Sequence, residues 1–342
     1  MGVNLRDLLH IEQTTIQRFS GQIMLVDSYN ILYQFLAGMR QSDGDLLRDS
    51  QNRVTSHLNG LFFRTINLMR EGLQMAFIFD GKPHELKYKT IKARIAVKEK
   101  AKEEWKLALE AGDMEKARSQ AQRTSRITKE MLQESKHLLD LMGVPHVQAP
   151  SEGEAQASHM VLNGKGNAVV SQDFDSVLFG APVVARNLAV SGRRKLPGKR
   201  AWINSPPEVI DYERTLSQLE VTREQLVDVA IMVGTDFNPG VKGIGPKKGL
   251  KLVKKYGGIQ AAVKGGGLKE EIPELEQLRQ IFLEPTVTDD YELNWGELDR
   301  DAIIRLLCDE HDFSRDRVNR ELDKLEKGLA GRSQKTLESF FG

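Results

Sequence analysis

Short apolar runs alternate with longer stretches of helical periodicity along the first two thirds of this chain. Three of the runs, at residues 23–27, 75–80 and 168–173, end in an aspartate. Short β-rich apolar runs that are separated by helices are typical of buried parallel strands. The pattern predicts an α/β fold in which helices flank a mixed, largely parallel central sheet.

The aspartates that end these runs are the first indication of a chemical site. In an open parallel sheet, ligands bind beyond the carboxyl ends of the strands, where these side chains should meet. Two negative charges about 4 Å apart repel by roughly 4 kcal/mol at an effective dielectric near 20, so cations must neutralise them. An all-oxygen set of this size suits a pair of Mg²⁺ ions, which together promote phosphodiester hydrolysis. The candidate ligands are Asp27, Asp80, Glu152, Glu154, Asp173, Asp175 and Asp236.

Each acid on its own also has a purely structural interpretation. An aspartate at a strand end is more often a turn or cap residue than a ligand. Ser151 and Glu154 fit a capping box at the start of a helix, with Ser151 as the N-cap residue. Glu152 lies in the same first turn, where both glutamates gain from the positive end of the helix dipole. It is the joint occurrence of the acids that favours metal binding.

The remaining pattern is mainly helical. Residues 82–135 are rich in Lys, Glu, Ala and Gln and are interrupted by Gly112-Asp113. They predict two long polar helices. Because such helices cannot bury much apolar surface, they should either cover another part of the protein or move relative to it. Beyond about residue 205 the periodicity is again helical, apart from a glycine-rich interruption at residues 240–249.

Composition indicates the setting. The chain has 342 residues and a single cysteine, Cys308, which excludes an intramolecular disulfide and a cysteine-based zinc site. No apolar run reaches the roughly 18 residues of a membrane span, and the N-terminus lacks the apolar core of a signal peptide. We expect a reducing intracellular compartment.

Charge is balanced overall, at a net +1, but it is unevenly distributed. Residues 186–200 and 237–256 each hold six Lys or Arg and no acid, and residues 82–130 hold 14 against eight acids. Basic surfaces that are separate from an acidic pocket suit a polyanion whose phosphate is brought to metal ions. One such run alone would be an ordinary solvated face.

A set of short motifs resembles the flap endonuclease family of structure-specific 5′ nucleases, and the likeness covers essentially the whole chain. The motifs are Val26-Asp27, residues 79–83 around Asp80, residues 149–155 around Glu152 and Glu154, residues 172–175 around Asp173 and Asp175, and Gly234-Thr235-Asp236. Each motif is weak alone, but the set is highly specific. Gln172 stands where the family usually has an acid, and Gly153 where it often has alanine, and both changes spare the ligands.

The resemblance implies a Mg²⁺-dependent endonuclease of DNA replication and repair. Such an enzyme cuts 5′ flaps at duplex junctions by two-metal hydrolysis and has 5′-3′ exonuclease activity in addition. The resemblance assigns the seven acids to two Mg²⁺ ions and identifies residues 82–135 as a helical arch for the single-stranded flap. On that alignment, Lys87 and Arg94 are catalytic cations that contact the scissile phosphate and withdraw charge in the transition state. The alternative for both is an ordinary surface cation.

The same resemblance implies DNA contacts elsewhere. Residues 241–249 resemble a helix–two-turn–helix element, whose glycines let backbone N–H groups approach phosphates, often beside a bound K⁺. Tyr33 matches a tyrosine that stacks on a base, although it could equally be a core residue, and residues 41–52 match a wedge where duplexes bend. Residues 313–317 resemble part of a pocket for a one-nucleotide 3′ flap, bordered by His311. The expected DNA-binding residues are Tyr33, Arg40, Lys242, Gly243, Gly245, Lys247, Lys248 and Arg317.

The last residues of the chain are polar and then aromatic. Exposed phenylalanines at a chain end are unfavourable unless a groove receives them. The pattern of Gln334, Leu337, Phe340 and Phe341 resembles a peptide that binds a sliding clamp of the proliferating-cell nuclear antigen type; docking onto the protein itself is the alternative. The chain stops at Gly342 without the basic extension of eukaryotic members. We therefore expect an archaeal monomer that is cytoplasmic and nucleoid-associated, or a nuclear one in a eukaryote.

This interpretation divides the chain into a nuclease domain over residues 1–327 and a flexible clamp-binding tail over 328–342. The domain comprises an N-terminal part over 1–98, the arch over about 82–135, an internal part over about 140–236, and the helix–two-turn–helix element with the C-terminal helices over about 237–327.

Three other functions stay open. The nearest is a related 5′-exonuclease or bubble-cutting nuclease, against which the compact arch and the clamp motif argue. A catalytically silent clamp-bound DNA adaptor would have no need for mutually repelling acids. A small-molecule phosphatase would leave the three basic regions without a role.

Overall fold

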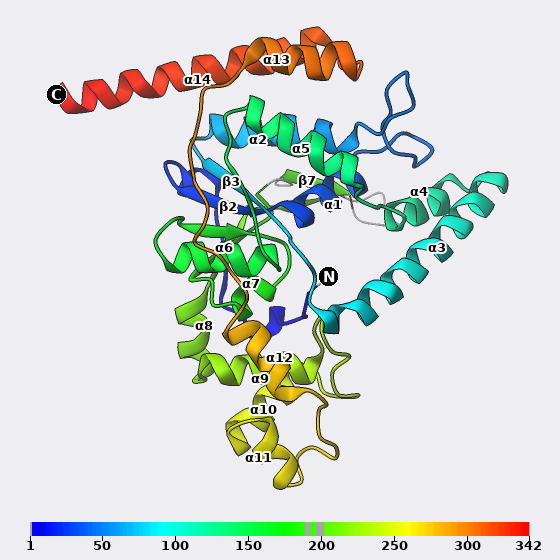
Figure 1. Cartoon of the computed structure of the whole chain (residues 1–342), viewed down its shortest axis with the longest axis vertical. Coiled ribbons are helices and arrows are strands. Elements are labelled where there is room, and N and C mark those ends of the chain that lie inside the picture. Colours follow the sequence, from blue (N-terminus) through cyan, green and yellow to red (C-terminus); the bar gives the residue numbers. More distant parts are fainter. Residues whose placement is uncertain (1, 189–191, 196–201, 342) are drawn as a thin grey trace.

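The computed structural model describes residues 2–188, 192–195 and 202–341, with side chains over 2–188 and 205–328 (Figure 1). Its main sheet consists of β1 (Ile11–Gln13), β2 (Ile23–Asp27), β3 (Gln74–Phe79), β4 (His146–Gln148), β5 (Ala168–Val170), β6 (Val183–Arg186) and β9 (Glu208–Asp211). The strand order is β1-β9-β6-β5-β2-β3-β4. The five strands from β6 to β4 are parallel, and β9 is antiparallel to both of its neighbours. The sequence prediction of a mixed, largely parallel sheet is therefore confirmed.

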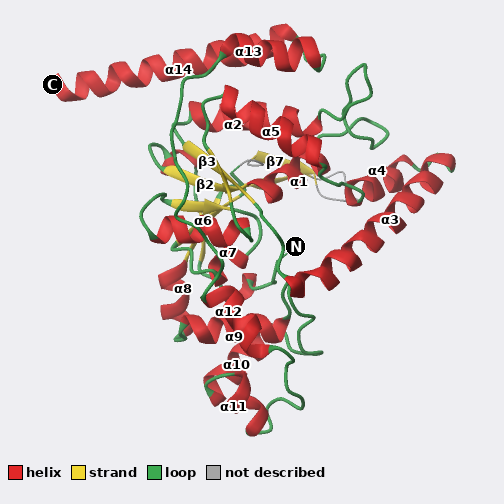
Figure 2. Ribbon diagram, viewed as in Figure 1, coloured by secondary structure: helices red, strands yellow, loops and turns green. Residues whose placement is uncertain are grey.

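Helices cover both faces of this sheet (Figure 2). One face packs against α6 (Gly153–Leu162), α7 (Asp175–Leu178) and α9 (Arg223–Val233), and the other against α1 (Ser28–Gly38), α2 (Ser56–Arg70) and α5 (Lys129–Leu141). The alternation of side chains along a strand supplies both cores. In β2, Leu25 joins the first core, whereas Met24 and Val26 join the second, and all three are buried.

Two helices, α3 (Tyr88–Glu110) and α4 (Met114–Arg123), project from this body (Figure 1). We call them the arch. They pack on each other through small side chains, since Ala101 and Ala108 of α3 and Ala117 and Ala121 of α4 are buried. The chain turns between them at Gly112, and Asp113 caps α4 by accepting a hydrogen bond from the Lys116 N–H at 3.0 Å. The interruption that the sequence indicated at Gly112-Asp113 is thus where the two helices meet.

The helices of the C-terminal part form two groups that lie at opposite ends of the molecule. At one end are α8 (Tyr212–Leu219), α10 (Pro246–Tyr256), α11 (Ile259–Lys264) and α12 (Leu275–Leu283). Residues 284–299 then run back without helix or strand to α13 (Arg300–Ile304), a π-helical segment (Arg305–Glu310) and α14 (Arg315–Phe341) at the other end (Figure 1). None of the described helices is long and apolar enough to cross a membrane.

Three details differ from the sequence-based expectations. β9 lies in the region beyond residue 205 that was expected to be helical, because a strand of four residues is too short to show a period against the helix that follows. The strands β1 and β6 of the main sheet, and the antiparallel pair of β7 (Gly192–Lys195) and β8 (Trp202–Ser205), also lie outside the predicted elements. Finally, α14 continues across residue 328, so the expected start of the tail is not a helix boundary.

Candidate active site

Seven acidic side chains come together beyond the carboxyl ends of the parallel strands. β2 lies between β3 and β5, so Asp27 at its end is flanked by the residues that follow β3 and β5. Charge interactions link these acids to those at the starts of α6 and α7 and after α9. We call this set the acid edge. Its members are Asp27, Asp80, Glu152, Glu154, Asp173, Asp175 and Asp236.

The acid edge is electrostatically unfavourable as it stands. Burial raises the pKa of Asp27 to about 8, and repulsion from Asp80 adds to the effect. Burial likewise raises the pKa of Asp175 to about 7, with repulsion from Asp236. A pKa that is raised by both causes means that the protein has concentrated more negative charge here than its own groups compensate.

Local hydrogen-bond donors that the sequence motifs did not indicate compensate for part of this charge. Asn30 donates its backbone N–H to Asp27 Oδ1 at 3.1 Å and its side-chain amide to Asp173 Oδ2 at 3.2 Å. Ser176 donates its hydroxyl to Glu154 Oε1 at 2.7 Å. Asn30 lies in the first turn of the helix after Asp27, a placement that could have identified it.

The N-terminus also reaches the acid edge. The Val3 N–H donates to Asp175 Oδ1 at 2.9 Å. A Cβ atom at Gly2 would lie 2.4 Å from the same oxygen, so only glycine fits there without displacing Asp175. Nothing in the local sequence indicates a contact between residues this far apart along the chain.

The capping box expected at Ser151 and Glu154 is wrong. α6 begins at Gly153, with Glu152 at the N-cap position and without a side-chain cap. The reason is that Asp80, which follows β3, accepts the Gly153 N–H at its Oδ1 at 2.6 Å. This N–H at the start of α6 has no partner within the helix and is paired by a distant side chain instead. Ser151 instead donates its hydroxyl to the Lys82 carbonyl at 3.2 Å. This frees the Glu154 side chain to face the acid edge.

Two cations from the base of the arch enter the acid edge. Lys87 donates from Nζ to Glu152 Oε2, and Arg94 donates from Nη2 to Asp236 Oδ1. Lys87 Nζ also lies 3.8 Å from Asp236 Oδ2. Burial alone would lower the pKa of Lys87, but Glu152 and Asp80 raise it overall. The two residues are therefore not ordinary surface cations.

The chemistry of these donors fits hard divalent cations, since all seven side chains offer carboxylate oxygen. Among the described residues, however, no three acidic, histidine or cysteine side chains already converge as a ligand set. Glu152 and Asp236 instead pair with the arch cations, and Asp80 Oδ1 accepts a backbone N–H. The ligand assignment therefore stays a prediction.

The residues expected to bind DNA lie on three separate parts of the body. Tyr33 on α1 is 36% exposed and carries Lys98 of α3 over its ring at 4.6 Å, so it is not a core residue. The glycine-rich turn leads into α10, with Gly243 at φ +79 and Gly245 as the N-cap residue. The three lysines of this turn, Lys242, Lys247 and Lys248, are exposed.

The remaining expected contacts have intramolecular partners. Arg40 is partly buried and donates to the Gly44 carbonyl at 2.8 Å and to Ser125 Oγ at 2.7 Å. Arg317 is exposed and lies over the Phe63 ring at 4.0 Å. His311 is 4% exposed, so its ring does not face an open pocket. The clamp-binding pattern of Gln334, Leu337, Phe340 and Phe341 lies on the part of α14 beyond residue 328, whose side chains are outside the described residues.

Comparison with known proteins gives consistent results along the chain. The XPG N-terminal domain matches residues 1–101, and the XPG I-region matches residues 143–236. Flap endonuclease 1 of Thermococcus onnurineus is 48% identical over 100% of this chain and 99% of its own length. The protein of that name from Methanosarcina barkeri is also 48% identical, over 100% of both chains.

The chain belongs to the flap endonuclease 1 family.

Solved structures agree with this family. Flap endonuclease-1 from Methanococcus jannaschii superposes with a TM-score of 0.75 at 41% identity, over 97% of this chain and 100% of that one. The catalytic core of Rad2 in complex with DNA substrate has a TM-score of 0.69 at 21% identity, over 94% and 97% of the two chains, and shows a shared fold. In this flap endonuclease the XPG matches contain all seven acids and both arch cations.

Proposed function

We propose that this chain cleaves DNA 5′ flaps at duplex junctions during replication and repair, by divalent-metal-dependent hydrolysis of one phosphodiester bond. The observation that carries the proposal is the meeting of the acid edge with Lys87 and Arg94, because it combines oxygen ligands for metal ions with cations for a phosphate. The relatives named flap endonuclease 1, 48% identical over the full chain, support the same substrate class.

The acid edge would hold a pair of Mg²⁺ ions. When bound, such ions supply Lewis-acid stabilisation of the charge that develops on attacking and leaving oxygens. The chain's own residues position the substrate. Lys87 and Arg94 would leave Glu152 and Asp236 as metal binds, and each would then donate to a non-bridging oxygen of the scissile phosphate. The products would be a 5′-phosphate and a 3′-hydroxyl.

Binding of the duplex is assigned to the turn before α10. Gly243 and Gly245 expose backbone N–H groups at the start of a helix, a suitable site for a phosphate, and K⁺ would bind beside it. Lys242, Lys247 and Lys248 add charge that holds the backbone without reading its sequence. Tyr33 would stack on a base beside the cut and contribute about 1–3 kcal/mol.

The sliding clamp is the proposed partner of the C-terminal residues. Gln334, Leu337, Phe340 and Phe341 supply the polar and aromatic anchors of a clamp-binding peptide. Deletion of residues 334–342 should abolish clamp binding in a calorimetric titration and leave flap cleavage in the absence of clamp unchanged. Clamp binding that survives the deletion would disprove this assignment.

The proposed activity is tested on end-labelled duplexes that carry either a 5′ or a 3′ flap, with and without Mg²⁺. We expect cutting at the base of the 5′ flap alone, and only with metal. DNA binding without cutting would indicate the adaptor instead, and preferential cutting of nicked or blunt duplex would indicate a 5′-exonuclease. Cutting of both flaps would make the junction assignment wrong.

A further inference from the structure

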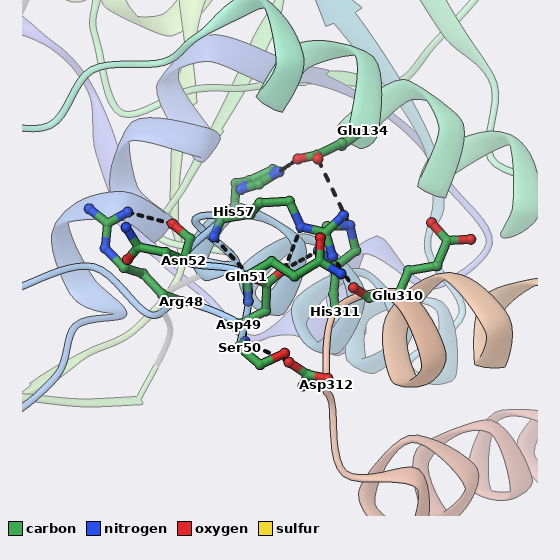
Figure 3. A network of polar contacts seen from close by, with 11 residues as sticks. Arg48, Asp49, Ser50, Gln51, Asn52, His57, Glu134, Glu310, His311 and Asp312 are labelled. Atoms are coloured by element: carbon green, nitrogen blue, oxygen red, sulfur yellow. Dashed lines mark hydrogen bonds and ion pairs between the residues drawn. The ribbon is translucent and has the colours of Figure 1, made fainter.

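A second group of buried and partly buried polar side chains lies away from the acid edge, where residues 49–57 meet α5 and the turn between the π-helical segment and α14 (Figure 3). Asp49 is its centre and is 9% exposed. Its Oδ2 accepts from Arg53 Nε at 2.7 Å and from His311 Nδ1 at 3.0 Å. Its Oδ1 accepts the backbone N–H groups of Gln51 and Arg53 at 3.0 and 2.8 Å. Both carboxylate oxygens are therefore fully used.

Glu134 of α5 extends this group. Its Oε2 lies 2.8 Å from Nε2 of His57, which is 1% exposed, and its Oε1 lies 3.8 Å from Nε2 of His311. Outside the group, Asp312 accepts the Ser50 N–H at 2.6 Å. We call Asp49, Arg53, His57, Glu134 and His311 the buried polar cluster. It joins the segment 40–55 to α5 through Glu134 and to the turn between the π-helical segment and α14 through His311, both distant from it in sequence.

The segment 40–55 has no helix or strand of its own, so its position on the body depends on its contacts with other elements. Between α1 and α2 it forms only two isolated β-bridges, Arg40 with Leu46 and Arg48 with Val54. Internal turn bonds, such as those from the Gln41 N–H to the Asp45 carbonyl and from the Asn52 N–H to the Asp49 carbonyl, shape the loop but do not attach it to the body. The buried polar cluster holds residues 49–53, in the second half of this segment, against the body.

The first half of the same segment contacts the arch. Arg118 of α4 donates from Nε to the Ser42 carbonyl at 2.5 Å. Arg40 joins the Gly44 carbonyl to Ser125, which follows α4. Gly44 packs so closely that an added Cβ would lie 3.0 Å from Ala121 Cβ of α4. The arch therefore rests on a loop that the buried polar cluster holds in place.

We propose that Asp49 and Glu134 are positioning residues: they fix the segment 40–55, which in turn seats α4 and keeps Arg94 of α3 at the acid edge. The last step rests on the proposed function of Arg94. α3 and α4 pack along their lengths, so a displaced α4 would carry α3 with it. A misplacement of about 1 Å far from the chemistry can reduce a rate by up to roughly a hundredfold.

Hydrogen–deuterium exchange tests, without reference to activity, whether Asp49 and Glu134 fix the segment 40–55 and thereby seat α4. Asp49→Asn places an amide donor against the donors of Arg53 and His311. We expect amide exchange over residues 41–46 and 114–124 to accelerate about tenfold at labelling times too short for β2 and β3 to exchange by global unfolding. Glu134→Gln should act in the same direction. Ser135→Ala is the matched control, since the one partner of this neighbouring buried hydroxyl among the described residues is the Met131 carbonyl of its own helix. Unchanged exchange over 114–124 in Asp49→Asn would overturn the proposal.

Gly44→Ala provides a second test if Asp49→Asn does not fold. It leaves the cluster intact but, at φ +94 and against α4, should accelerate exchange over 114–124. Exchange that stays at the wild-type rate there would show that the loop does not seat the arch.

Single-turnover cleavage tests the link to Arg94. We expect Asp49→Asn to lower kcat about tenfold and to leave KM within about twofold, because the duplex grip at α10 is untouched. Asp49→Asn combined with Arg94→Ala should cleave no more slowly than Arg94→Ala alone, and additive losses would overturn the proposal. If Arg94→Ala alone has no effect, the function proposed for Arg94 fails, and the exchange rates decide the seating of the arch separately.

Discussion

The acid edge and the buried polar cluster both bury carboxylates, yet their electrostatics are opposite. At the acid edge, burial and neighbouring acids raise the pKa of Asp27 and Asp175. Burial has the same tendency at Asp49, but hydrogen bonds from Arg53 and His311 outweigh it and lower the pKa. Burial alone therefore does not distinguish the two regions. The supply of hydrogen-bond donors distinguishes them. Donors of the protein compensate the charge of Asp49, whereas the charge of the acid edge is only partly compensated, as expected of a site for external cations.

The largest effect is expected from removing a charge at the acid edge. Asp175→Asn, like Asp173→Asn, should slow flap cleavage roughly a thousandfold or more, because metal ions contribute several kcal/mol in the transition state. DNA affinity should be largely preserved, and the melting temperature should not fall. Single-turnover rates and anisotropy measurements on the same DNA separate these effects.

Asp289→Asn is the matched control, since Asp289 is 77% exposed and pairs only with His159 among the described side chains. It should leave cleavage unchanged. If Asp175→Asn lost DNA binding as strongly as cleavage, its assignment as a catalytic ligand would be wrong.

A smaller loss is expected at the arch cations. Arg94→Ala or Lys87→Ala should lower kcat about a hundredfold, since each removes one charged donor from the phosphate. Lys89→Ala, on the exposed side of the same helix, serves as the control in the same assay. An equal loss of kcat in Lys89→Ala and Lys87→Ala would mean that only the general positive charge of this region matters.

Substitution in the buried polar cluster should also change the stability of the protein. Asp49→Asn leaves buried donors unsatisfied and should reduce the free energy of unfolding by about 1–3 kcal/mol in urea titrations at neutral pH. The folded pKa of Asp49 is lowered, so its contribution is present above its unfolded pKa and is lost as the pH falls through the folded value. The variant and the wild type should therefore converge in stability in acid. A difference that is constant down to about pH 3, below the ordinary pKa, would contradict this sign.

The acid edge should show the opposite pH dependence. The folded pKa of Asp27, about 8, lies above its ordinary value of 3.8, so the metal-free protein loses stability as the pH rises between these values. Cations relieve the repulsion, and Mg²⁺ should raise the melting temperature by more degrees at pH 8 than at pH 6. Thermal unfolding with EDTA and with Mg²⁺ at both pH values measures this. An equal increase at the two pH values would show that the ions bind elsewhere.

The sequence was sufficient to predict a feature where the residues that form it follow a local pattern. Asp27, Asp80 and Asp173 follow apolar runs, and parallel pairing of β3, β2 and β5 made their meeting predictable. The break at Gly112-Asp113 was predictable for the same reason, because a glycine and a capping residue stand between two helical patterns.

Sequence was insufficient where the partner is distant along the chain. Asp80 replaces Ser151 as the group that satisfies the start of α6, and Val3 binds Asp175, although neither contact has a local signal. His311 was expected to border a nucleotide pocket, but Asp49 binds it in the interior. Short strands such as β9 were missed because their pattern is too brief to be periodic.

A calorimetric titration of the wild-type protein with Mg²⁺ at pH 8, beside Asp175→Asn, tests the central claim most directly. If the acid edge is built for external cations, the wild type should bind a pair of ions and the variant should bind fewer or bind them more weakly. A wild-type protein that binds no divalent ion, or a variant that binds them equally well, would contradict the account.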